Sequence, residues 1–133
     1  MIQTYSNNVD ATANSSIPLK NLTILKGFST TKEGDTILLN RCGVYKVEVD
    51  GSVTVPSGGS VSIQLEVNNV LQSDTFSTVT AVAIQVIPFH FDKLIQVPFS
   101  NTPNPCASPT SVKIISNVAA TYNHVNVIVT KIA

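Results

Sequence analysis

The sequence predicts an all-β domain, built as a sandwich or barrel of short antiparallel strands. β-branched residues dominate its hydrophobic set, with 18 Val and 12 Ile among 133 residues, and such side chains pack well on pleated surfaces. Several short stretches alternate apolar and polar residues with a period of two, separated by turn residues. No stretch shows a 3.6-residue period, so we expect almost no helix.

Two short strand candidates come first, at 22–28 and 36–39. The clearest strand follows at 44–55, where Tyr45 and four valines fall on one face and charged or hydroxyl residues on the other. This alternation is typical of a strand with one buried face. A stretch of Pro, Ser and Gly at 56–60 predicts the turn that ends it.

The next alternating strand is predicted at 61–67, and the two asparagines after it suit a tight turn because Asn tolerates a positive φ. Residues 79–87 differ because both faces are apolar, with Val82 and Ile84 on one face and small alanines on the other. A strand covered on both sides belongs in a core or at a subunit interface. We therefore predict that a neighbouring copy of the chain covers this strand.

A loop is predicted at 98–110, where four prolines in thirteen residues exclude a helix or a central strand. Strands resume at 112–117 and 125–130. Together, these short strands and their turns are typical of a single sandwich or barrel domain.

The first twenty residues are interpreted as an N-terminal anchoring segment, and residues 21–133 as the folded domain. Asn, Asp and Ser make the segment polar, and Pro18 closes it. Its apolar residues are enough to dock on a partner but too few to build a core: Ile2, Tyr5, Val9 and Ile17. Deleting 1–16 is expected to leave a folded oligomer that no longer attaches to a larger assembly.

Charged residues make up only 12% of the chain, eight basic and eight acidic, and they are scattered. This leaves no basic stripe for phosphates, so nucleic acid is not expected as a partner. No apolar run reaches the roughly 18 residues of a membrane span, and no secretion signal is visible. We expect synthesis in a cytoplasm, no membrane contact, and partner chains that cover part of the weakly charged surface.

Side chains with reactive or ligating groups are few. His90 and Asp92 share a strand face, but a metal site needs a third and fourth ligand, and the other histidine is His124. Neither a nucleophile elbow nor a phosphate loop is present. We therefore predict no catalytic residue, no cofactor, no metal and no enzyme activity. His90 is interpreted as a surface or interface residue; if the histidines met across subunits, protonation near about pH 6.5 would loosen the oligomer.

The two cysteines, Cys42 and Cys106, are expected to be reduced thiols in a cytoplasm. A free thiol packs as a small hydrophobe. Pairing of the two after release from the cell is the alternative.

Three segments resemble the C1q/TNF-like jelly-roll superfamily. They are GVYKV at 43–47 preceded by ILLN at 37–40, LEVNN at 65–69, and YNHVNV at 122–127. The resemblance covers about residues 25–133 and implies an antiparallel two-sheet jelly-roll sandwich. Val and Ile stand where the family has a Phe-rich last strand.

The whole chain is similar to a bacterial and phage branch of that group. Its opening at 2–9 and its ending at 129–132 resemble virion or prophage proteins of Gram-positive hosts, and the C-terminal domain of exosporium collagen-like glycoproteins is also similar. This resemblance implies a compact homotrimer on a particle surface. It also implies that five residues lie near the trimer seam: Tyr45, Val82, Ile84, Val125 and Val127.

The resulting hypothesis is a non-enzymatic structural protein of a bacteriophage virion, either a capsid decoration protein or a head-fibre component. It would form a homotrimeric knob on the virion surface, with other copies of itself and capsid or other virion proteins as partners. The alternative is a receptor-binding or carbohydrate-binding module of a phage tail or spore surface. Sugar sites favour exposed aromatic rings, and three Tyr without Trp weaken that alternative.

Overall fold

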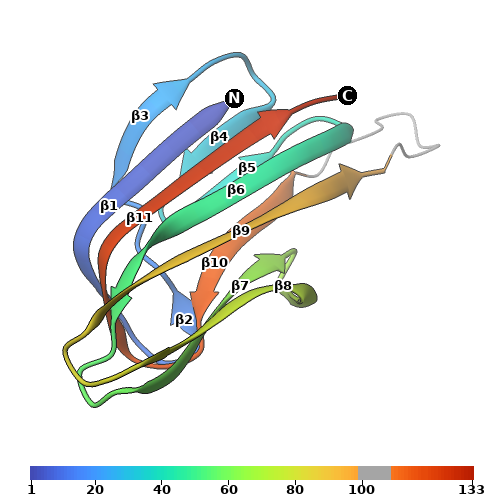
Figure 1. Cartoon of the computed structure of the whole chain (residues 1–133). Coiled ribbons are helices and arrows are strands. Elements are labelled where there is room, and N and C mark those ends of the chain that lie inside the picture. The colour runs from blue at the N-terminus through green and yellow to red at the C-terminus, as the bar shows by residue number, and fades with distance from the viewer. Residues whose placement is uncertain (99–108) are drawn as a thin grey trace.

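The computed structural model describes residues 1–98 and 109–133, except for the side chains of 73–79 and 81. All regular elements in these ranges are strands, arranged in two antiparallel sheets that pack face to face (Figure 1). The all-β prediction and the two-sheet jelly-roll sandwich are thereby confirmed. In the part of the chain that is described, no helix is long and apolar enough to cross a membrane.

The first sheet has five strands in the order β3-β1-β11-β6-β9. Every neighbouring pair is antiparallel, and the first and last strands of the chain lie side by side in its middle. The bounds are β3 (Asn21–Leu25), β1 (Ile2–Ala11), β11 (Ala120–Lys131), β6 (Gly43–Thr54) and β9 (Val86–Val97).

The second sheet has the order β4-β5-β10-β7-β8, and a short strand also pairs with β10. Edge strands β8 and β9 are consecutive in the chain but pair in different sheets, and a tight turn joins one sheet to the other (Figure 1); we call the two strands and this turn the β8–β9 hairpin. The bounds are β4 (Thr30–Glu33), β5 (Thr36–Leu39), β10 (Thr110–Ser116), β7 (Gly59–Val67), β8 (Val70–Ala81) and the short β2 (Ser15–Ser16).

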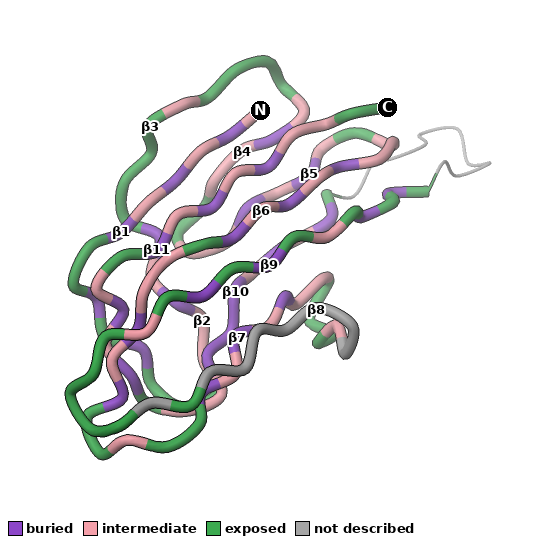
Figure 2. The backbone as a smooth tube through the Cα atoms, viewed as in Figure 1, coloured by how far each residue is buried: buried purple, intermediate pink, exposed green. Residues whose placement is uncertain are grey.

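The core lies between the sheets and consists mainly of Val, Ile and Leu (Figure 2). Along β6, Tyr45, Val47 and Val49 are fully buried, while the residues between them are half-buried or exposed. Each fully buried aliphatic side chain of this kind contributes about 1.5–3 kcal/mol. The period of two read from 44–55 therefore reports the real inward and outward faces of this strand.

The prediction that residues 1–20 lie outside the core is wrong. β1 pairs with β11 on one side and β3 on the other, and Ile2, Val9 and Ile17 are buried. The sequence of β1 lacks the hydrophobic alternation of a half-buried strand, because two of its inward residues, Thr4 and Ser6, are polar.

An irregularity at Asn8 also breaks the alternation of β1. Asn8 has a positive φ of 51° and has no partner in the register with β11, whereas Asn7 and Val9 do. The inward positions therefore change from even to odd numbers along the strand.

The prediction of one strand at 79–87 is also wrong. β8 ends at Ala81 and β9 begins at Val86, and a tight turn lies between them. The Gln85 amide N–H donates to the Val82 carbonyl at 3.0 Å, and the Gln85 side-chain oxygen accepts from the Val82 N–H at 3.3 Å. The turn places Val82 and Ile84 at an exposed tip instead of a doubly covered strand.

Cys42 is disulfide-bonded, so it is not the reduced packing thiol that was expected. Cys106, the other cysteine of the sequence, lies outside the described residues, as does most of the loop predicted at 98–110. The asparagine turn after 61–67 is confirmed, because Asn68 and Asn69 have positive φ angles of 49° and 66°.

Candidate interaction surface

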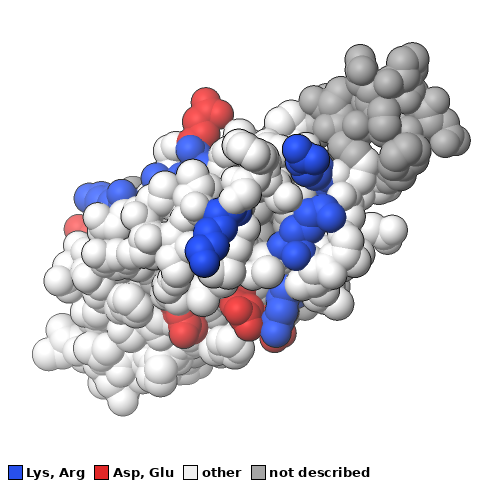
Figure 3. Space-filling view, turned by 90° about the horizontal axis from the view of Figure 1, so that it is seen from above, with Lys and Arg blue, Asp and Glu red and all other residues white. Residues whose placement is uncertain are grey.

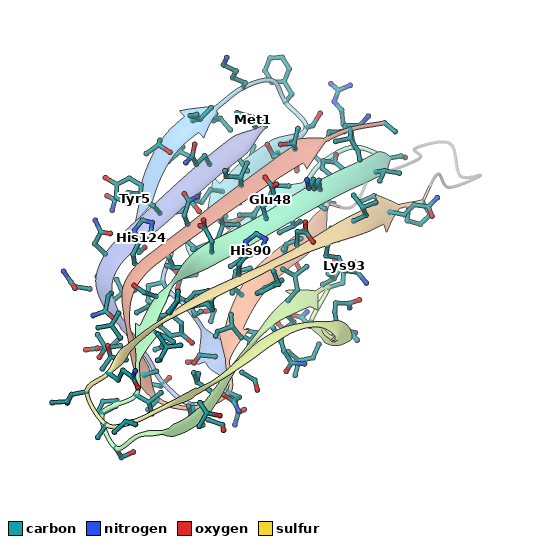
Figure 4. The ribbon with its side chains drawn as sticks, viewed as in Figure 1. Met1, Tyr5, Glu48, His90, Lys93 and His124 are labelled. Atoms are coloured by element: carbon teal, nitrogen blue, oxygen red, sulfur yellow. The ribbon has the colours of Figure 1, made fainter. Side chains whose placement is uncertain are left out.

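The outward side chains of the five-stranded sheet are half-buried or exposed, so they form a surface outside the core. Cross-strand partners align its side chains in rows that run across the sheet (Figure 4). One row consists of Tyr5, Asn126, Asp50 and His90, and the next row consists of Gln3, Ile128, Glu48 and Asp92. We call this surface the outer face.

Hydrogen bonds between neighbouring strands fix several of these side chains. The Gln3 amide nitrogen donates to the Asn126 side-chain oxygen at 3.1 Å. His124 Nδ1 and the Asn7 side-chain oxygen are 2.8 Å apart. Hydrogen bonds therefore hold amide and imidazole groups on this face, and Tyr5 and Ile128 lie half-buried on the same face.

Charge on the outer face is sparse and mostly acidic. Lys46 Nζ lies 3.1 Å from Glu48 Oε1, an exposed pair of the kind that contributes little to stability. Asp50 and Asp92 are exposed, and Asp50 lies directly opposite His90. Viewed from above, the molecule shows several neighbouring basic and acidic groups, and the lower left of this view is uncharged (Figure 3).

The histidines share the outer face without forming a metal site. His90 is on β9 and His124 is on β11, and β6 runs between these strands. Among the described residues, no group of three His, Cys, Asp or Glu side chains is placed to hold a metal ion.

A surface hollow of about 400 Å³ lies along the edge strand β9 and is lined by Lys46, Asp92, Lys93 and Leu94. A nucleophile with a neighbouring base would be the sign of a catalytic centre, and these four residues do not provide that pair. The hollow is a notch of mixed charge beside the outer face.

Three of the residues predicted at the trimer seam face the core of their own subunit. Tyr45, Val125 and Val127 are completely buried between the two sheets of one subunit, so their side chains cannot contact another copy. On each strand the outward residue is the next one along, as with Lys46, Asn126 and Ile128. That prediction followed the resemblance, which places these strands near the seam, and it named residues of β6 and β11 that face inward.

The other two predicted seam residues are available for contact. Val82 and Ile84 are 73% and 82% exposed at the tip of the β8–β9 hairpin. Among the predicted anchoring residues, Ile2, Val9 and Ile17 are buried, and Tyr5 alone is partly exposed, on the outer face. The outer face itself was missed, because recognising it requires the register between strands that are distant in the sequence.

The fold is similar to that of solved structures over almost the whole chain. No protein-family model matches the sequence, and no curated protein matches it either. A structure of murine APRIL superposes with a TM-score of 0.65 at 9% identity, covering 98% of both chains. Vertex protein P5 of PRD1 superposes with a TM-score of 0.58 at 14% identity, covering 99% of this chain and 96% of that one. At such identities the likeness concerns the fold, which is a TNF-like jelly roll.

Proposed function

We propose that the protein is a non-enzymatic structural component of a virion surface, in which three copies assemble into a knob through the outer face. The observation that carries the proposal is a sheet face that lies outside the core of the described chain. The jelly roll takes up almost the whole described chain, and the outward face of its five-stranded sheet lies outside the core and carries few charges. The likeness to vertex protein P5 of PRD1 supports the virion setting.

The outer face has the composition of a surface that another protein can cover. Its central residues are a tyrosine, an isoleucine and side-chain amides already held by hydrogen bonds, so little side-chain entropy remains to be lost on association. Three of its carboxylates, Glu48, Asp50 and Asp92, lie on β6 and β9, and Asp10 lies near the end of β1 beside Thr121, so the rows through Tyr5 and Gln3 carry no charge on β1 or β11. Aromatic residues are enriched in such interfaces and acidic residues are depleted.

The direct test of the trimer is its mass in solution. Light scattering at micromolar concentration should give about three times the 14.2 kDa of one chain. A mass of one chain would contradict the proposal. Cryo-electron microscopy of purified particles should then show knobs of threefold symmetry on the capsid, and their absence would refute the virion role.

A point substitution tests whether the outer face is the contact. Ile128→Lys places a charge in the centre of the face, and Glu48 directly opposite can pair with it, so the subunit should still fold. Burying that charge against another copy is costly, so the trimer should dissociate. Thr12→Lys, at an exposed turn, is the control and should leave the mass unchanged.

Carbohydrate binding is the second candidate, and one observation favours it. The ring of Tyr5 lies beside the side-chain amide of Asn126, which Gln3 holds in place, and sugars bind to aromatic rings flanked by planar polar groups. A glycan array separates the two functions. Binding that is lost in Tyr5→Ala would support the sugar site, whereas a trimer that buries Tyr5 and binds no glycan would exclude it.

A further inference from the structure

At the tip of the β8–β9 hairpin, the residue type does not suit the backbone conformation of the turn. Ile84 has a positive φ of 60°, and the other four non-glycine residues with positive φ in the described chain are all asparagine. A β-branched side chain is disfavoured in this conformation because its Cβ crowds the backbone. Two neighbouring turns follow the expected pattern, with glycines at 58 and 59 and asparagines at 68 and 69.

The same tip exposes apolar side chains where polar residues are the rule. Val82, Ile84 and Val86 are 73%, 82% and 54% exposed. The two hydrogen bonds between Val82 and Gln85 close the turn, so these side chains project from a defined loop. Positions at which the local rules fail in this way are often functional sites.

The charge pattern around the tip selects its partner. From Thr75 to Phe89 the sequence contains no ionisable residue. A nucleic acid or an anionic membrane would be recognised through Lys and Arg, so the tip suits an uncharged protein surface.

The position of the tip points to a second copy as that surface. β8 and β9 are edge strands of the two sheets, and β9 carries its outward side chains, from Val86 to Gln96, onto the margin of the outer face. An exposed edge of this length that ends in an apolar tip promotes aggregation unless it is covered. A contact with another copy through the outer face would extend onto the tip without a break.

We propose that the hairpin tip packs against a second copy of the chain, and that Ile84 keeps its disfavoured backbone conformation because its side chain is needed in this contact. This inference rests on the proposed homotrimer. The isolated subunit would be more stable with Asn or Gly at this position. Ile84 therefore lowers the stability of the subunit and favours assembly.

Ile84→Asn tests both halves of the inference in the full-length chain, because Asn accepts a positive φ but is polar. Sedimentation over a range of concentrations should show trimer association weakened by about tenfold or more. Thermal melting at a dilution where all variants are monomeric should give a midpoint no lower than that of the wild type. Ile84→Val keeps a β-branched apolar side chain and should retain association.

Val70→Asn is the matched control, since Val70 is 61% exposed beside the asparagine turn at the start of β8. It should not change association. The inference is overturned if Ile84→Asn associates like the wild type, if Val70→Asn weakens association equally, or if Ile84→Asn lowers the melting midpoint of the monomer. A monomeric wild type would overturn the trimer itself, while a trimeric wild type that tolerates Ile84→Asn would overturn only the role of the tip.

Discussion

At the scale of single residues, two buried hydroxyl groups on β1 are in opposite situations. Ser6 Oγ donates to the Pro18 carbonyl at 2.7 Å and accepts from the Lys20 N–H at 2.8 Å. Thr4 is equally buried, and its hydroxyl has no hydrogen-bond partner among the described residues. A buried hydroxyl without a partner costs about 1–3 kcal/mol, whereas a satisfied one stabilises.

This contrast predicts opposite effects for two similar substitutions. Thr4→Val removes the unsatisfied hydroxyl at nearly constant shape and should raise the free energy of unfolding by about 1 kcal/mol. Ser6→Ala leaves the Lys20 N–H and the Pro18 carbonyl without their partner and should lower it by about 1–2 kcal/mol. Urea unfolding of both variants measures the two changes, and a destabilised Thr4→Val would show that the hydroxyl is satisfied after all.

Tyr122 provides a prediction on pH. Its hydroxyl donates to Ser116 Oγ at 2.6 Å, and burial raises the pKa of its phenol from 10.0 to about 12. The folded state therefore keeps a proton that the unfolded chain releases above pH 10.0. The contribution of this group is fully present below that pH and is lost as the pH rises toward about 12.

Denaturant unfolding across this pH range should show a free energy that falls as the phenol of the unfolded chain ionises. Tyr122→Phe cannot ionise, so its curve should be flatter in the same range. It should also be less stable than the wild type at neutral pH by about 1 kcal/mol because the bond to Ser116 is lost. Parallel curves for the two proteins would disprove the role of Tyr122.

At the scale of the strands, the sequence predicts those whose inward residues are apolar and regularly spaced. The segments 44–55 and 61–67 correspond to β6 and β7, since one face of each is in the core and the other is not. β1 could not be found in this way because Thr4 and Ser6 face inward and Asn8 shifts the parity. The turn at 82–85 was missed because Ile84 occupies a position where Gly or Asn is the signal.

The outer face is harder to predict than the core for a related reason. Its rows join β1, β11, β6 and β9, which are far apart in the chain. Alternation shows which residues of a strand share a side, but it does not show which strands are neighbours. The sequence indicated two tip residues, Val82 and Ile84, as contact residues, and it misplaced the remainder of the seam into the core.

The corrected role of β1 reverses the deletion experiment first expected from the sequence. Removing residues 1–16 takes a strand from the middle of the sheet and the buried Ile2 and Val9 from the core, so the remaining chain should not fold. Ile2→Ala should cost about 2–5 kcal/mol by the same reasoning. Circular dichroism and limited proteolysis measure both changes; a folded deletion variant would restore the reading of this segment as an anchor.

At the scale of the whole molecule, the two ends of the chain meet in the centre of one sheet. Ile2 pairs with Val129, so the start of β1 and the end of β11 lie at the same end of the sandwich (Figure 1). The hairpin tip at 82–85 lies at the other end. In a trimer of parallel subunits, all termini would therefore emerge at one end, and the three tips would gather at the opposite end.

This arrangement predicts that the fold tolerates circular permutation. A linker of about five residues can join Ala133 to Met1 as a hairpin loop between β11 and β1. New ends at Asn68 and Asn69 open an exposed turn between β7 and the edge strand β8. The permuted chain should keep the β-sheet circular dichroism spectrum and the oligomeric mass of the wild type, because every strand retains its neighbours.

A second permutant with the same linker but with its ends between Val49 and Asp50 is the control. This cut divides β6, which pairs with both β11 and β9. It also places the buried Val49 at a free end of the chain. That chain should fail to fold or should melt far below the first permutant. If both permutants fold equally well, the continuity of β6 is not what holds the five-stranded sheet together. If both fail, the ends of β1 and β11 cannot be joined as their pairing implies.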